Sequence, residues 1–196
     1  MASKRSYFCA LFTSFCLVAA SPALFASDSP SLDMNSNGNA ACAWFTYDSS
    51  SGNILLQTNT FIGSSWGSPA TLPGFTPASN LFAPKIAVIT NVNNSQDISA
   101  VVIWSQPNGA GYMSVYASTY VDTSSGWSSP AEIASGTESA VGSTQYFIKI
   151  DPAGNAIALW SAVDSSGNEY IRSSTSYIYN QTPNVWSSTP TSVSGP

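Results

Sequence analysis

Apolar residues along this chain gather in three short runs of similar composition: 40-AACAWF-45, 100-AVVIW-104 and 156-AIALW-160. Each run is apolar on consecutive residues, which is typical of a strand that is buried on both faces. A polar turn precedes each run, and a segment that alternates in part, such as 112–121, follows it. The pattern therefore predicts sheets built from short strands joined by tight turns.

Two series of tryptophans indicate that the chain contains three repeats. Members of the first series stand 60 and 56 residues apart: Trp44, Trp104 and Trp160. Members of the second series stand 61 and 59 residues apart: Trp66, Trp127 and Trp186. The segments that follow the second series also match, as 66-WGSPATL-72 and 127-WSSPAEI-133 show. Self-similarity at a fixed period is the signature of a repeat architecture.

Each repeat is predicted to contain four strands separated by turn residues. The first strands are expected at about 31–34, 85–90 and 146–150. The second strands are expected at about 40–46, 99–105 and 156–162. The third strands are expected at about 54–61, 112–121 and 169–179. The fourth carries the Trp-Ser-Ser-Pro element, whose proline belongs at a sheet edge because it lacks a backbone N–H.

An inner strand buried on both faces and an outer strand marked by proline are what a β-propeller blade requires. The predicted fold class is all-β, with three consecutive four-stranded antiparallel blades in a β-propeller-like arrangement, either a partial propeller or half of an oligomeric ring. The blades are expected at about 31–74, 84–136 and 146–195. The first tryptophan of each blade is expected to fill the gap to a neighbouring blade.

The motifs GNA-x-A-x-W and GW-S-x-P resemble tandem repeats of secreted or surface bacterial proteins. The resemblance implies β-propeller-like blades, mostly without an assigned activity. The third repeat fits best with 154-GNAIALW-160, whereas the first has 65-SWGSP-69 in place of Gly-Trp and the second has 98-IS-99 in place of Gly-Asn.

Three blades are fewer than the roughly four to eight of closed propellers. Two chains could pair into a six-bladed ring, the chain could be a truncated member of its family, or the blades could stack openly. An open array exposes apolar faces at both ends, which favours a homo-oligomer.

The first residues have the plan of a secretory signal, with Lys4 and Arg5 before an apolar run and small residues near Ala26. We expect residues 1–26 to be removed and 27–196 to form one repeat domain, with a retained anchor or lipid attachment as the alternative. The protein is then expected to be secreted, periplasmic or at the cell surface, with no membrane insertion after cleavage.

Loss of those two cations takes the formal net charge from −5 to −7. The remaining cations, Lys85, Lys149 and Arg172, are too few to neutralise a nucleic-acid backbone or an anionic membrane surface. The sequence therefore argues against both of these partners.

Catalytic chemistry has little support in the sequence. It contains no histidine, which removes Ser-His-Asp and Cys-His catalysis and the commonest zinc ligand. Cys42 stays alone after the signal and is interpreted as a buried structural thiol. Asp48 and Asp164 lie in matching hairpins, where Asp before Gly is ordinary turn chemistry. Arg172 alone cannot form the arginine cluster with which sialidase-like propellers hold a carboxylate. We expect neither an enzyme nor a cofactor.

The stretch 33-DMNSNGN-39 reproduces the first half of a calcium loop, with Asp33, Asn35 and Asn37 at alternate positions. It also resembles the calcium loops of some integrin-type blades. Trp44 stands where an EF-hand has its bidentate glutamate, so no metal is predicted and an Asx-type hairpin turn is the preferred interpretation.

Aromatic rings are the remaining candidates for recognition, because sugars present apolar C–H faces that stack on such rings. The candidate ligand-binding residues are Trp66, Trp127, Trp186, Tyr112, Tyr116 and Tyr120. Packing is the alternative role for each ring. We therefore expect an exported binding module, lectin-like or related to adhesion, with a glycan as its partner. The alternative is a structural or assembly protein that contacts other proteins of the bacterial envelope.

Overall fold

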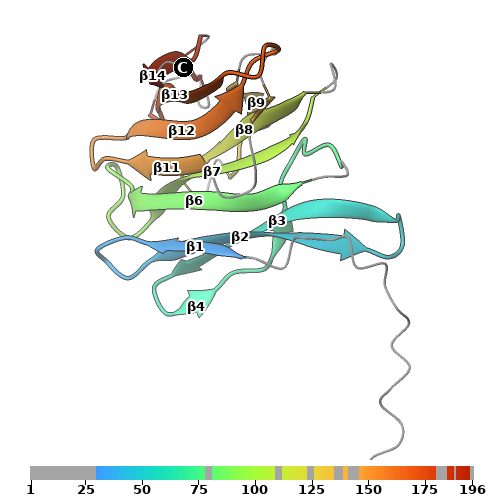
Figure 1. The fold of residues 1–196 in the computed structure, drawn as a ribbon. Helices are drawn as coiled ribbons and strands as arrows, with labels where there is room; N and C mark the ends of the chain where they lie inside the picture. The colour runs from blue at the N-terminus through green and yellow to red at the C-terminus, as the bar shows by residue number, and fades with distance from the viewer. Residues whose placement is uncertain are drawn as a thin grey trace, which may run out of the picture.

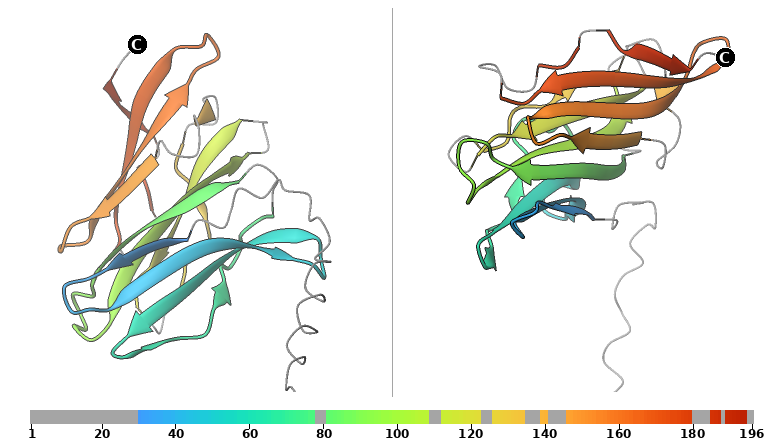
Figure 2. Two further views of the ribbon diagram at one scale, coloured as in Figure 1. Left: turned by 60° about the horizontal axis from the view of Figure 1, so that its bottom comes forward. Right: turned by 90° about the vertical axis from the view of Figure 1, so that its left-hand side faces the viewer.

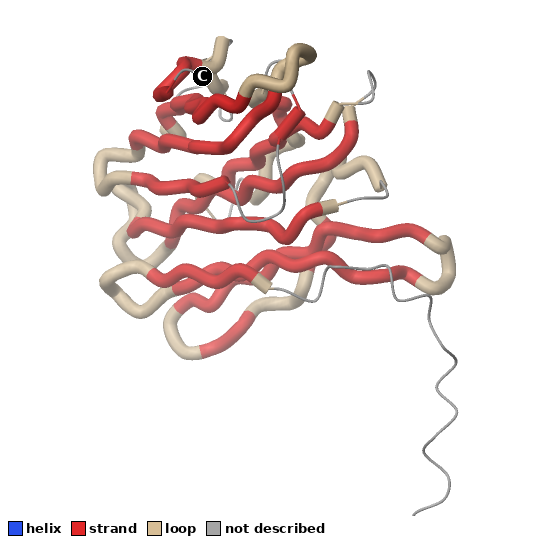
Figure 3. Tube along the Cα trace, in the orientation of Figure 1, coloured by secondary structure: helices blue, strands red, loops and turns tan. Residues whose placement is uncertain are grey.

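The computed structural model describes residues 30–77, 81–108, 112–122, 126–134, 139–140, 146–179, 185–187 and 189–194. Within these ranges every regular element is a β-strand (Figure 3). No α-helix of the length and hydrophobicity needed to span a bilayer occurs in this part of the chain. The predicted signal segment, 1–26, lies outside the described residues.

The first sheet, sheet A, is antiparallel and follows the order of the chain. Its strands are β1 (Ser31–Met34), β2 (Ala40–Asp48), β3 (Asn53–Ile62), β4 (Ser65–Trp66) and β5 (Ala70–Thr71). Both short strands pair with β3 on the side away from β2, so together they occupy the fourth strand position.

Sheets B and C repeat this plan. Sheet B contains β6 (Phe82–Thr90), β7 (Ile98–Pro107), β8 (Met113–Tyr120) and β9 (Ala131–Glu132). Sheet C contains β10 (Ser139–Ala140), β11 (Tyr146–Ile150), β12 (Asn155–Val163), β13 (Glu169–Tyr177) and β14 (Thr191–Ser194). Both β10 and β11 pair with β12 and share the first strand position. Trp127 and Trp186 form isolated bridges that extend the fourth position.

The three sheets stack face to face in the order A, B, C, and their first strands β1, β6 and β11 are neighbours (Figures 1 and 2). The predicted fold class is confirmed: the described chain forms three consecutive four-stranded antiparallel blades in a propeller-like arrangement that is not closed into a ring. The predicted first, second and third strands all occur close to their expected bounds.

The first tryptophan of every blade points to the same side of its own sheet, which we call the tryptophan face; the opposite side is the receiving face. Trp104 is 0% exposed and packs between sheets A and B, and Trp160 is 2% exposed and packs between sheets B and C. By the same register Trp44 points away from sheet B, and its side chain is only half-buried. The predicted gap-filling role is confirmed for Trp104 and Trp160 and wrong for Trp44, because no other described sheet lies on that side.

Burial on both faces is likewise limited to the middle sheet. Every residue of β7 from Ile98 to Gln106 is buried, because sheets A and C cover its two faces. Buried and more exposed positions alternate along β2 and β12, since each end sheet has one face away from sheet B. The prediction of doubly buried second strands therefore holds for β7 and is wrong for β2 and β12.

The turn between β6 and β7, residues 91–97, is longer than its counterparts and contacts both neighbouring blades. Asn37 Nδ2 donates a hydrogen bond to the Ser95 carbonyl at 2.9 Å. On the other side, the Val92 N–H donates to the Tyr179 hydroxyl oxygen at 3.2 Å. One end of all three blades is thereby tied together.

Candidate functional site

A cleft of about 750 Å³ lies at the end of sheet C where the turn between β11 and β12 meets the end of β13. Its volume falls within the range of roughly 300–1,000 Å³ that is usual for small-molecule sites. Tyr177 contributes an exposed ring to its lining, whereas Trp186, also among the lining residues, is only 8% exposed and belongs to the core between sheets B and C. Its polar lining residues include Lys149, Asp151, Asn155 and Thr175.

In sheets A and B, the second tryptophan packs against an aromatic neighbour on the third strand. Trp66 pairs with Phe61, and their ring centroids lie 5.5 Å apart in an edge arrangement. Trp127 bridges to Tyr120, with centroids 5.4 Å apart. In both blades a second ring therefore fills the space beside the indole.

Sheet C lacks that second ring. Trp186 bridges to Ser176, which occupies the strand position of the aromatic residue in the other blades. The Ser176 hydroxyl donates to the Val185 carbonyl at 2.7 Å, which holds the segment of Trp186 beside β13. Both Ser176 and Trp186 line the cleft. Ser176 and Trp186 are, however, both 8% exposed, and Trp186 belongs to the core between sheets B and C. The strand registers place Lys149, Ile157, Thr175 and Tyr177 on the opposite side, so the cleft opens on the receiving face of sheet C.

The polar part of the cleft is organised by the turn between β11 and β12. The Asp151 carboxylate accepts hydrogen bonds from the Asn155 side-chain amide at 2.7 Å and from the Asn155 backbone N–H at 2.8 Å. These bonds favour the charged form and lower the pKa of Asp151 below its ordinary value. The cleft therefore carries a fixed carboxylate at neutral pH, together with the exposed ammonium group of Lys149.

A second, smaller cleft of about 320 Å³ is lined by Trp104, Gln106 and Tyr116 among others. The Trp104 indole N–H donates to Gln106 Oε1 at 2.8 Å, and the Tyr116 ring stacks on the indole with centroids 6.0 Å apart. Burial, with a smaller contribution from the charge of Glu132, raises the pKa of Tyr116. These contacts serve packing between sheets A and B.

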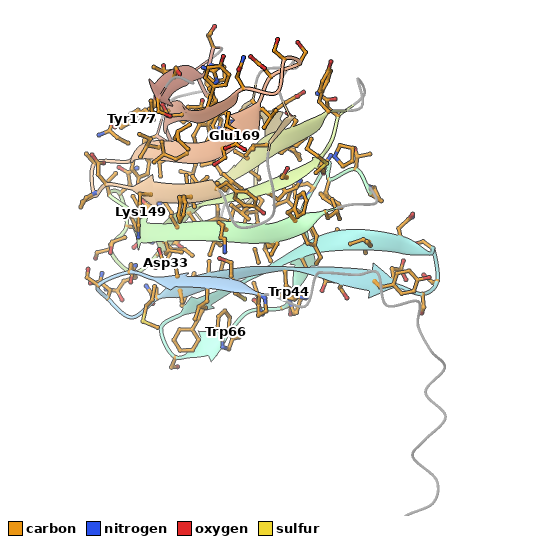
Figure 4. All side chains as sticks on the ribbon, viewed as in Figure 1. Asp33, Trp44, Trp66, Lys149, Glu169 and Tyr177 are labelled. Atoms are coloured by element: carbon orange, nitrogen blue, oxygen red, sulfur yellow. The ribbon has the colours of Figure 1, made fainter. Side chains whose placement is uncertain are left out.

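The structure does not bring the six predicted aromatic residues together. Trp186 lines the larger cleft and Tyr116 the smaller one. Trp66 is exposed on the tryptophan face of sheet A, at the bottom of Figure 4.

The other three predicted rings line neither cleft as described. Tyr120 belongs to the core between sheets A and B, and Trp127 packs against that core. Tyr112 is half-buried just before β8. Sequence reasoning missed Tyr177, which ends β13 on the face of sheet C away from sheet B. No repeated motif marks that position.

The calcium candidate forms a turn whose side chains bond in different directions. Asn35 Oδ1 accepts the backbone N–H groups of Asn37 and Asn39, both at 3.0 Å. Asp33 Oδ2 instead accepts the Val88 N–H of sheet B at 2.8 Å. These bonds form the Asx-type turn that the sequence favoured. Among the described residues, no three Asp, Glu, Cys or His side chains are grouped so that they could hold a metal ion.

Asp48 and Asp164 cap their hairpins. Asp48 accepts hydrogen bonds from the Ser51 hydroxyl at 2.6 Å and the Ser50 hydroxyl at 2.7 Å, and these bonds lower its pKa to about 2. Asp164 accepts from the Asn168 side chain at 3.0 Å and from the Asn168 backbone at 2.9 Å, which also lowers its pKa. Both carboxyl groups are therefore ionised turn residues at neutral pH and are unsuited to act as general acids.

Thermal stability is expected to fall as the pH drops below about 4, the ordinary pKa of Asp in an unfolded chain. Because hydrogen bonding lowers the folded pKa of Asp48, Asp151 and Asp164, their contribution is present above that pH and is lost as the pH falls towards 2. Unfolding midpoints measured by circular dichroism between pH 7 and pH 2 test this. In Asp48→Asn the unfolding midpoint should fall less between pH 4 and pH 2 than in the wild type. An equal fall in the two proteins would contradict the assignment of Asp48.

Cys42 lies on the tryptophan face of sheet A and is half-buried. The interpretation of Cys42 as a buried thiol therefore holds only in part, because no other described sheet covers this face. Partial burial still raises the pKa of the thiol and disfavours the reactive thiolate.

No protein-family model and no curated protein matches the chain in sequence. Several solved structures are similar to it, including the two that follow. One is the Hadza microbial sialidase Hz136, with a TM-score of 0.47 and 12% identity over 82% of this chain and 36% of that chain. The other is a fucose lectin from Kordia zhangzhouensis in complex with methyl-fucoside, with a TM-score of 0.44 and 10% identity over 81% of this chain and 96% of that chain. The chain thus spans about a third of the sialidase, and TM-scores below 0.5 establish neither a shared fold nor a shared ligand.

Proposed function

We propose that the protein is an exported, non-enzymatic binding module that holds a carbohydrate in the cleft of sheet C. The observation that carries the proposal is the cleft on the receiving face of sheet C, where the exposed ring of Tyr177 lies beside the polar groups of Asp151, Lys149 and Thr175. A sugar ring has one apolar C–H face that fits against an aromatic ring, and Tyr177 supplies such a ring.

The polar lining suits the hydroxyl groups of such a ligand. The Asp151 carboxylate is held by Asn155 and accepts strong hydrogen bonds from hydroxyl groups. Lys149 and Thr175 add donors from the adjoining strands. An apolar platform with a few converging polar groups is the usual composition of a small-ligand site.

Thr175→Trp is expected to abolish glycan binding, because Thr175 is exposed and lines the cleft, so the larger ring would occupy it. The chain should stay folded, as circular dichroism would show. The measurement is a glycan array, followed by titration of tryptophan fluorescence with the sugar that the array selects. Glycan binding that persists unchanged in Thr175→Trp would overturn the assignment of the cleft.

Tyr177→Ala removes an exposed ring of the cleft and is expected to weaken binding about tenfold, since loss of an aromatic anchor typically costs about 1–2 kcal/mol. Tyr47→Ala is the matched control, because Tyr47 is also an exposed tyrosine on a strand but does not line the cleft as described. Equal affinities in the two variants would argue against a role for Tyr177.

A structural or assembly role in the bacterial envelope is the second candidate function. The observation that favours it is the pair of apolar end faces, on which Leu32 is 58% and Phe147 is 60% exposed. Exposed apolar patches of this kind usually mark contacts with other proteins. Co-purification with envelope proteins, with no glycan retained by a folded chain, would favour this role over carbohydrate binding.

A further inference from the structure

The two interfaces within the chain join the same two faces in the same order. Between sheets A and B, the receiving face of A meets the tryptophan face of B. The buried residues that sheet A contributes are Ala41, Ala43, Phe45 and Leu56. Those that sheet B contributes include Ile86, Val88, Val102 and Trp104.

The interface between sheets B and C repeats this arrangement. The receiving face of B contributes Ala87, Val101, Ile103 and Val115. The tryptophan face of C contributes Tyr146, Ile148, Ala158 and Trp160. One type of contact, with a single polarity along the chain, therefore occurs twice.

This polarity leaves one face of each kind without a partner sheet among the described residues. The tryptophan face of sheet A carries Leu32, Met34, Cys42 and Trp44, of which the first two are exposed and the others half-buried. The receiving face of sheet C carries Phe147, Ile157, Leu159 and Ile171, all of them exposed except the half-buried Leu159. The two uncovered faces are the two halves of the contact that the chain makes internally.

We propose that the tryptophan face of sheet A docks onto the receiving face of sheet C of a second copy of this chain. The contact continues the established interface, and Trp44 enters a gap of the kind that Trp104 and Trp160 fill. Such a contact is heterologous, so two copies give a six-bladed ring if the rotation closes and a longer stack if it does not. A ring of six lies within the usual range for propellers.

The internal interface also shows which residues meet. In the first blade pair, Ser31 Oγ accepts the N–H of Ile86 at 3.1 Å, so β1 and β6 are in direct contact. The strand registers place Phe147 at the position of Ser31, and Leu32 at the position of Ile86. Phe147 of one copy is therefore expected to contact Leu32 of the next.

Lys149 fits the same arrangement. It occupies the register position of Asp33, whose carboxylate accepts the N–H of Val88 on the edge of β6. An edge strand presents carbonyl groups as well as N–H groups, so an ammonium group at this position can donate to the edge of β1 of the second copy. The single cation on this face therefore has acceptors within the proposed contact.

The test is the mass of the full chain by sedimentation over a range of concentrations. The wild-type chain is expected to associate, while Leu32→Lys and Phe147→Glu should each raise the dissociation constant about a hundredfold or more, because each buries an unpaired charge. The double variant L32K/F147E pairs these charges across every contact and should regain association. Val92→Glu, an exposed apolar position in the turn between β6 and β7, is the control and should associate like the wild type.

A wild-type chain that sediments as a single copy at every concentration would overturn the proposal and leave the end faces to another protein. Loss of association in Leu32→Lys but not in Phe147→Glu would also overturn it, because the contact would then join two tryptophan faces. Failure of the double variant to recover would contradict the assigned pairing. Ile157 and Lys149 belong both to this face and to the cleft, so association would cover the cleft. Glycan binding is therefore measured separately on Phe147→Glu, in which the face stays free and whose substituted residue does not line the cleft as described, so that failure of one proposal is distinguished from failure of the other.

Discussion

Trp104→Ala is expected to destabilise the chain by about 3–5 kcal/mol, the usual cost of truncating a fully buried aromatic residue. The indole is in the core between sheets A and B, with the rings of Phe75 and Tyr116 each 6.0 Å from it. Its removal also takes away the hydrogen bond that Gln106 Oε1 accepts inside the core. Because small domains have roughly 5–15 kcal/mol of stability in total, this change removes much of it.

Trp44→Ala is the matched comparison, since the same residue sits at the same point of the repeat on a face that no other described sheet covers. Its half-buried ring should contribute only about 1–2 kcal/mol to the stability of a single chain. Urea unfolding followed by circular dichroism, at concentrations too low for association, measures both changes. Equal losses in the two variants would refute the one-directional stacking of the blades.

Gly154→Ala is expected to cost about 2–5 kcal/mol from two additive causes. Gly154 has φ of +91°, a conformation that costs an L residue about 1–2 kcal/mol. A Cβ here would also lie 2.4 Å from Tyr179 Cδ2 and 3.2 Å from Ile178 Cγ1. The ring cannot move away freely, because the Tyr179 hydroxyl bonds to Val92 and to Ser99 of sheet B. Overpacking of this kind typically adds about 1–3 kcal/mol.

Gly38→Ala separates the two causes, because Gly38 occupies the corresponding turn of the first blade. Its φ is +82°, but nothing lies within 4 Å of an added Cβ. Only the backbone cost of about 1–2 kcal/mol is therefore expected. Thermal or urea unfolding of both variants provides the comparison, and a loss in Gly154→Ala no larger than that in Gly38→Ala would show that Tyr179 yields easily.

The candidate site was only partly predictable from the sequence. Trp186 was proposed as a ligand-binding residue from its place in the second tryptophan series, yet its ring is buried in the core between sheets B and C at the back of the cleft. Tyr120, predicted from the same kind of evidence, lies in the core instead. A repeat pattern aligns equivalent positions, but it does not show that the face of sheet C bearing Thr175 and Tyr177 stays uncovered, because that depends on how the sheets stack.

The sequence alone determined the all-β class, the three blades and the turn roles of Asp48 and Asp164, because these follow from local periodicity and turn chemistry. The tertiary structure decided which repeated residues are buried. Trp44 and Trp104 share one sequence context, yet only Trp104 has a neighbouring sheet against its face. Burial depends on how many sheets pack against a strand. That number is a property of the whole stack and cannot be inferred from the sequence of one repeat.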